Sequence, residues 1–140
     1  MKFRLISRVL GIGLIAFSFL QLTPIIVSIV YNEDNIVAFA YSFLITLAFG
    51  SILYLVNCEK KYEGIRVKEG FLLTVLLWLF FTVFATLPFI FGSKTGLSIV
   101  SAYFEATSGL TTTGATIFSD LSGEYYSILF YRGLLQWIGG

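Results

Sequence analysis

Three long stretches of the chain contain no charged residue, and they run from Val9 to Val30, from Ile36 to Asn57 and from Phe71 to Phe91. Each is close to the roughly 20 residues that an α-helix needs to cross about 30 Å of hydrocarbon. A charged side chain at the bilayer centre costs on the order of 2.5–3.5 kcal/mol on insertion scales, so charge-free stretches of this length are typical of membrane spans. Because their apolar residues are continuous rather than alternating, we predict three transmembrane helices and not barrel strands.

The composition agrees with an all-α membrane protein. Hydrophobic residues make up 57% of the chain and charged residues 12%, against about 25% charged residues in ordinary soluble domains. The single cysteine, Cys58, cannot form an internal disulfide or a paired metal site, and there is no histidine. Since the three stretches also contain no acid or base, we expect no enzyme and no cofactor. The net charge of +1 argues against a nucleic-acid partner.

The charges between the stretches predict the orientation. Basic residues lie in the N-terminal tail and in the loop at residues 59–70, whereas the loop after the first stretch holds only the acids Glu33 and Asp34. By the positive-inside rule, the N-terminus and the 59–70 loop are cytoplasmic, and the segment from Gly92 to about Ser127 lies outside. The basic residues are Lys2, Arg4 and Arg8 in the tail, and Lys60, Lys61, Arg66 and Lys68 in the loop.

Two prolines fall late in their stretches, Pro24 in the first and Pro88 in the third. Membrane helices tolerate proline where neighbouring groups satisfy the freed carbonyl. Each proline therefore marks either a kink near the outer face or the end of its helix.

The segment from Leu97 to Ser108 predicts a short helix of about a dozen residues. Such a helix is roughly 18 Å long, about half the hydrocarbon thickness, so it cannot span the membrane but can enter it as a re-entrant pore helix. The uncharged segment GLTTTGAT follows, from Gly109 to Thr116. Non-helical backbone at membrane depth must be buried in protein or line a watery path.

A cation site is one interpretation of this segment. The backbone carbonyls of Thr111, Thr112, Thr113 and Gly114 can replace the water shell of a permeating ion, as carbonyls do in potassium filters. Gly114 lacks a Cβ and can adopt a positive φ that redirects neighbouring carbonyls. The C-terminal end of the preceding helix carries a partial negative charge, near −0.5, that favours a cation. The other interpretation is a polar turn at the surface.

The string FEATSGLTTTGAT at residues 104–116, followed by YRGLLQWIGG at residues 131–140, resembles the first pore repeat of the Trk/Ktr/HKT potassium transporter superfamily. The likeness is strongest to the bacterial TrkH branch and extends over the whole chain. The strings SGLTTTGAT and LLQWIGG are specific together, whereas TTTG alone is not.

This resemblance implies four pore repeats arranged around one pore, of which this chain holds the first, incomplete. Residues 1–58 would then be two additional N-terminal transmembrane helices, and residues 71–140 the outer helix, pore helix, filter and start of the inner helix. Potassium would be bound by the backbone carbonyls of Thr112, Thr113 and Gly114. Family members with glycine at the filter position generally select potassium, whereas those with serine in the first repeat tend to pass sodium.

The resemblance also implies partners and a location. A cytosolic nucleotide-binding regulatory subunit would dock on the inner face of a bacterial plasma (inner) membrane, and a homodimer is possible. Membrane lipid and the potassium ion are the other expected partners.

Two charged residues near the predicted filter are candidates for its support. Glu105 lies on the predicted pore helix and either hydrogen-bonds the filter backbone or a neighbouring helix, or faces a watery vestibule. Arg132 either stabilises the filter loop or its acids, Asp120 and Glu124, or anchors its helix at the membrane interface.

We therefore expect potassium transport through a carbonyl-lined selectivity filter, as part of a Trk-type uptake system. Two alternatives stay open: a single-repeat channel subunit that assembles as a tetramer, and a non-conducting truncated membrane fragment. The apolar stretch from Ser127 to Gly140 is too short to span the bilayer, so we expect the chain to be part of a longer protein.

Overall fold

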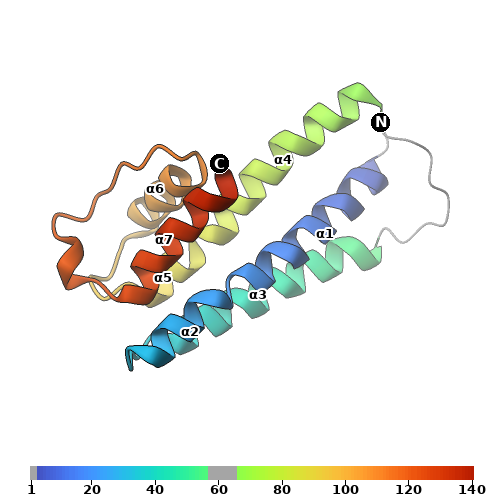
Figure 1. Ribbon diagram of the computed structural model, residues 1–140. Helices are drawn as coiled ribbons and strands as arrows, with labels where there is room; N and C mark the ends of the chain where they lie inside the picture. Colours follow the sequence, from blue (N-terminus) through green and yellow to red (C-terminus); the bar gives the residue numbers. More distant parts are fainter. Residues whose placement is uncertain (1–2, 57–65) are drawn as a thin grey trace.

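The computed structural model describes residues 3–56 and 66–140, and in these ranges the protein contains helices and no strand (Figure 1). The helices are α1 (Phe3–Leu20), α2 (Thr23–Val30), α3 (Ile36–Val56), α4 (Val67–Ala85), α5 (Leu87–Gly92), α6 (Ile99–Leu110), the short 3-10 helix η1 (Leu121–Gly123) and α7 (Tyr126–Gly139). The predicted all-α architecture is confirmed.

In the described part of the chain, three helical segments are long and apolar enough to cross a membrane: Phe3–Val30, Ile36–Val56 and Val67–Gly92. They correspond to the three predicted spans. The first and third begin four to six residues earlier than their charge-free stretches, because basic residues continue the helix and long basic side chains are tolerated at span ends. Residues 57–65, with Cys58, Lys60 and Lys61, lie outside the described residues.

The three spans run side by side (Figure 1). The start of α1, the end of α3 and the start of α4 lie at one end of the molecule. The α2–α3 loop, the end of α5 and the start of α7 lie at the other end. Many large apolar side chains on the spans are exposed, including Ile26, Leu44 and Val75, as expected for helices whose outer faces contact lipid.

Proline interrupts the third span, which resumes after it. Pro88 lies in the first turn of α5, directly after the break at Thr86. Since proline has no N–H, the carbonyl of Phe84, four residues earlier, loses its helical donor. The side-chain amide of Gln21 donates to this carbonyl over 3.0 Å. The Tyr131 hydroxyl donates to the next carbonyl, that of Ala85, over 3.2 Å.

The first span is interrupted in the same way at Pro24. The Thr23 hydroxyl donates over 2.8 Å to the carbonyl of Leu20, which has lost its helical donor. Gln21 lies in this break and is fully buried. Its Oε1 is 3.0 Å from the hydroxyl of Thr46 on α3, which also lies 2.8 Å from the Ser42 carbonyl. Of the two interpretations of the prolines, interruption within a continuing span is therefore correct.

These contacts form a buried polar cluster that we call the proline hub: Gln21, Thr46, Tyr131 and the carbonyls of Phe84 and Ala85. It joins all three spans and α7. An unsatisfied carbonyl in a water-free interior is costly, so the hub fixes how the spans pack at the level of their breaks.

We expect Gln21→Leu to lower the free energy of unfolding by about 1–3 kcal/mol, because it leaves the Phe84 carbonyl without a donor. Thermal unfolding of the purified protein in detergent measures the change. Ser42→Ala is the matched control, since the Ser42 hydroxyl bonds only a carbonyl within its own helix, that of Ala38 at 2.8 Å. Equal destabilisation by the two substitutions would contradict the role assigned to Gln21.

Candidate functional site

A short helix, α6, begins near the end of the molecule that holds the α2–α3 loop and stops level with the middle of the third span. α6 has 12 residues and is therefore about 18 Å long. Its last residue, Leu110, lies beside Trp78 and Phe81, which stand near the middle of the third span, Val67–Gly92. Ser98 precedes the helix and caps it, because its hydroxyl accepts from the Ser101 N–H over 3.2 Å.

The inner end of α6 packs closely against α7. Ala102, Ala106 and Leu110 of α6 are buried, and Gly109 faces Leu135. At the end of α7, a Cβ on Gly139 would overlap the carbonyl oxygen of Leu110. Glycine at this position therefore lets the two helices meet at backbone distance.

A tight turn ends α6 and begins the candidate filter. The Thr112 N–H donates to the Gly109 carbonyl over 3.0 Å, and the Thr113 N–H donates to the Ser108 carbonyl over 3.0 Å. This is the Schellman pattern, which requires a left-handed residue after the helix. That residue is Thr112, with φ +57°. A β-branched residue rarely adopts such a φ, and the strain costs on the order of 1–3 kcal/mol.

Gly114 provides a second left-handed position two residues later, with φ +77°, as its lack of a Cβ led us to expect. The Ser108 hydroxyl donates to the carbonyl of Ala115 over 2.6 Å, which ties the far side of this turn to α6. The side-chain nitrogen of Gln136 on α7 is 3.8 Å from the place that a Cβ would occupy on Gly114.

The four predicted ligand residues expose free backbone carbonyls. Thr111, Thr112, Thr113 and Gly114 are all exposed. Within residues 3–56 and 66–140, no hydrogen-bond donor reaches their carbonyl oxygens. Since protein carbonyls at membrane depth need a partner, these four oxygens are available to a ligand or to another part of the protein.

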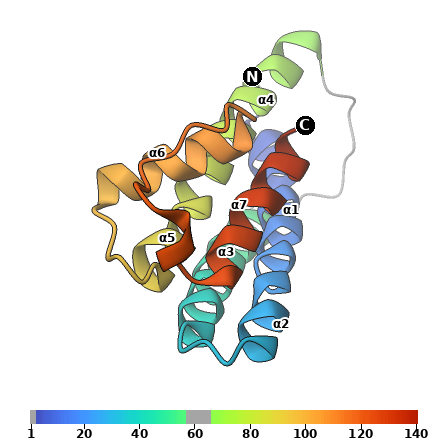
Figure 2. The same cartoon turned by 60° about the vertical axis from the view of Figure 1, so that its left-hand side comes forward.

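Glu105 and Arg132, the two predicted supporting residues, form an ion pair behind this segment. The Arg132 Nε donates to Glu105 Oε2 over 2.8 Å, and the Glu105 side chain is fully buried. Glu105 Oε1 accepts from the Thr116 hydroxyl over 2.6 Å and from the Ile117 N–H over 2.7 Å. Glu105 thus connects α6, the backbone that follows the candidate filter, and α7. Figure 2 shows that backbone running back along α6 toward the start of α7.

Arg132 does not pair with Asp120 or Glu124 in the loop before α7, which was one of the alternatives left open by the sequence. It lies well inside α7 and faces α6, whereas Asp120 bonds the N–H and hydroxyl of Ser122. Glu124 accepts from the Lys94 N–H over 2.6 Å and from the Ser93 hydroxyl over 2.7 Å. Burial opposes ionisation of Glu124, but these donors together lower the pKa of its carboxyl below the ordinary value. Of the alternatives for Arg132, the pairing with Asp120 or Glu124 is therefore the one that the contacts contradict.

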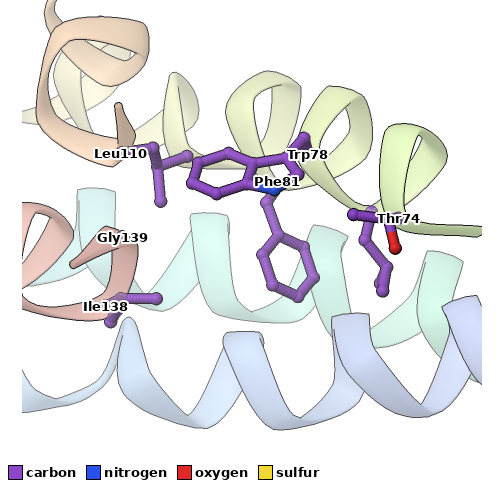
Figure 3. A pocket seen from close by; sticks show the side chains of 7 residues that line it. Thr74, Trp78, Phe81, Leu110, Ile138 and Gly139 are labelled. Carbon is purple, nitrogen blue, oxygen red and sulfur yellow. The ribbon is translucent and has the colours of Figure 1, made fainter. Parts of the chain in front are cut away.

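Beneath the end of α6 lies a cavity of about 210 Å³ (Figure 3). Its lining is almost entirely apolar, and none of the four candidate ligand residues contributes to it. The lining residues are Thr74, Leu77, Trp78, Phe81, Leu110, Ile138 and Gly139. A dehydrated cation needs several oxygen ligands, so this cavity is not an ion site.

A double-mutant cycle tests the ion pair. We expect Glu105→Gln and Arg132→Gln to be non-additive in the free energy of unfolding, with a coupling energy of about 1–3 kcal/mol, because the two side chains are in contact and Glu105 is buried. The same cycle with Asp120→Asn and Arg132→Gln is the matched control and should be additive. Additivity in the first cycle would contradict the pair.

Comparisons with known proteins agree with one another. Residues 35–140 match the family described as "TrkH: Cation transport protein". The chain is 44% identical over 140 residues to the "Trk system potassium uptake protein TrkH" of Salmonella typhimurium, covering 100% of this chain and 29% of the relative. The protein of that name from Escherichia coli strain K12 is 43% identical over the same coverage.

A solved structure gives the same result for the fold. The potassium transporter TrkH from Vibrio parahaemolyticus superposes with a TM-score of 0.92 at 37% identity, covering 99% of this chain and 30% of that chain. The chain therefore spans less than a third of the length of the curated relatives and the solved structure that it matches.

Proposed function

The chain belongs to the TrkH family of cation transport proteins, and we propose that it supplies one wall of a potassium-selective pathway, in which the carbonyl oxygens of Thr111 to Gly114 replace water around the ion. Its relatives carry the name of potassium uptake proteins, not of enzymes. Residues 71–140 would form the first pore repeat, with α4–α5 as outer helix, α6 as pore helix and α7 as the start of the inner helix.

The observation that carries the proposal is the set of unpaired carbonyls on a strained turn. Extended backbone sends successive groups to opposite sides of the chain. The left-handed residues Thr112 and Gly114 interrupt this alternation. Strain at a β-branched residue persists only where the surroundings impose it, and such strain clusters at functional sites. The four oxygens are unbonded within the described residues, and they are the ligand type that potassium takes in filters.

Depth and electrostatics favour a cation at the same place. α6 ends beside the middle of the third span, so its C-terminal partial negative charge would lie near the bilayer centre. Glu105 and Arg132 carry opposite charges and neutralise each other behind the turn. The backbone dipoles, rather than a net side-chain charge, would therefore set the field at the ion.

One chain segment cannot surround an ion, so other walls are needed. The family resemblance implies that further pore repeats of a longer protein supply them. With this assembly we propose a wider arrangement: a cytoplasmic N-terminus, as the charges of the loops predict, and, as the family resemblance implies, a bacterial inner membrane with a nucleotide-binding regulatory subunit on its inner face. We also propose a homodimer.

We expect Gly114→Ser in the intact transporter to lower the ratio of potassium to sodium uptake. A side chain at φ +77° is strained by about 1–2 kcal/mol, so the loss is about five- to thirtyfold if that strain falls on the potassium-bound filter. Uptake of the two ions by vesicles containing the purified variant gives the ratio.

Gly96→Ser is the matched control for this substitution. Gly96 also has a positive φ, +66°, and no atom lies within 4 Å of the place where its Cβ would be. It precedes α6 in the outer loop and contacts no part of the candidate filter. If both variants kept the ratio of the unmodified transporter, the assignment of Gly114 would be wrong.

A further inference from the structure

The loop between the first two spans reaches across to the start of α7. The carboxylate of Glu33 accepts from the Tyr126 N–H over 2.5 Å and from the Ser127 N–H over 3.1 Å. These are N–H groups of the first turn of α7, which no carbonyl of that helix can bond. A negative charge at this position also complements the helix dipole. An acid more than 90 residues away in sequence thus caps the helix.

Glu33 is held in place by the way α2 ends. Asn32 adopts φ +52°, its N–H donates to the Ile29 carbonyl over 3.2 Å, and the Glu33 N–H donates to the Ser28 carbonyl over 2.9 Å. This is again a Schellman ending, here with asparagine at the left-handed position, which asparagine tolerates well. The backbone that carries the carboxylate is therefore fixed to α2.

Neighbouring residues strengthen the same contact. The Asn35 amide nitrogen donates to the Ser127 hydroxyl over 2.8 Å and lies 3.3 Å from the Gly92 carbonyl at the end of α5. Tyr31 stacks on Tyr126 with ring centroids 4.4 Å apart. We call these three residues, Tyr31, Glu33 and Asn35, the outer clamp. Both views place the α2–α3 loop beside the start of α7 (Figures 1 and 2).

α7 connects the outer clamp to the candidate filter. Arg132 follows Tyr126 by six residues, about 9 Å along the helix, and bonds Glu105 over 2.8 Å. Glu105 in turn holds the N–H of Ile117, just after the filter turn. Gln136, one turn beyond Arg132, lies against Gly114. A helix transmits a displacement along its axis, so a shift of its start would move both contacts.

We propose that Glu33 is a positioning residue for cation selectivity. It fixes α7 along its axis and thereby sets the distance between Arg132 and Glu105 behind the filter. The two N-terminal spans would then contribute to selectivity although they provide no ligand to the ion. The inference rests on the proposed function, since it assumes that Thr111 to Gly114 form the filter.

The experiment compares Glu33→Gln with Asp34→Asn in the intact transporter. Both substitutions replace one acid of the same loop by its amide. Asp34 is exposed and makes no hydrogen bond or ion pair with any described residue. Potassium and sodium uptake by vesicles is measured for each, together with the amount of membrane-inserted protein. Gly114→Ser is run alongside as the test of the filter itself.

We expect Glu33→Gln to lower the potassium-to-sodium ratio by about two- to thirtyfold, the range seen for residues that couple to a site without touching its ligand. Asp34→Asn should keep the ratio. A loss of both fluxes at an unchanged ratio would overturn the proposal, because it would show an ordinary structural role. If Glu33→Gln left both the fluxes and the potassium-to-sodium ratio unchanged, the proposal would be overturned as well.

Two further results keep the outcome decisive. If Glu33→Gln does not insert, Glu33→Asp is measured instead: it keeps the charge but is too short to reach both N–H groups, so a lowered ratio supports the proposal and an unchanged ratio overturns it. If Gly114→Ser shifts the ratio while the Glu33 variants do not, only the role of Glu33 fails. If Gly114→Ser leaves the ratio unchanged, the assignment of the filter is wrong, and the role of Glu33, which depends on that assignment, falls with it.

Discussion

Inside a bilayer no water is available to bond a free carbonyl, and this constraint governs the arrangement of the chain. The break at Pro88 leaves two carbonyls late in the third span without helical donors, and side chains from other segments bond them: Gln21 donates to Phe84 and Tyr131 to Ala85. Gln21 is itself placed by the break at Pro24. The two prolines are thus structurally linked, because the second break needs a donor that the first break turns inward.

The same need of carbonyls for a partner applies to the candidate filter, but here the protein provides no donor. There the carbonyls of Thr111 to Gly114 are left without donors in the described chain, while the backbone on either side is bonded. At the near end the Thr112 and Thr113 N–H groups bond carbonyls of α6, and at the far end Ser108 holds Ala115 and Glu105 holds Ile117. A segment that is fixed at both ends and unsatisfied in between is suited to a ligand that supplies positive charge, because a cation satisfies carbonyl oxygens as a donor would.

The length of the charge-free apolar stretches was sufficient to predict the three spans, because a charge inside the bilayer is so costly that membrane helices exclude it from their central part. The short helix was predicted from length alone, and its end was two residues later than expected because Gly109 and Leu110 continue it.

The contacts of Arg132 could not be predicted. In sequence Arg132 is nearer to Glu124 and Asp120 than to Glu105, and only the direction of α7 relative to α6 selects Glu105. The outer clamp was missed for the same reason, as its partners are more than 90 residues apart.

These contacts meet on one helix. α7 is held at its start by Glu33, in its middle by the hydrogen bond of Tyr131 to Ala85 and the ion pair of Arg132, and at its end by the close approach of Gly139 to Leu110. Tyr131 and Arg132 are adjacent in sequence but bond different partners: Tyr131 bonds in the proline hub, and Arg132 bonds Glu105 of α6. A helix that is held at its start, middle and end by the α2–α3 loop, α4 and α6 has little freedom to slide along its axis. The α2–α3 loop, through Glu33, and the proline hub thus fix the position of α7 against α6. Under the proposed function, this packing, though remote from any ion, would belong to the geometry on which selectivity depends.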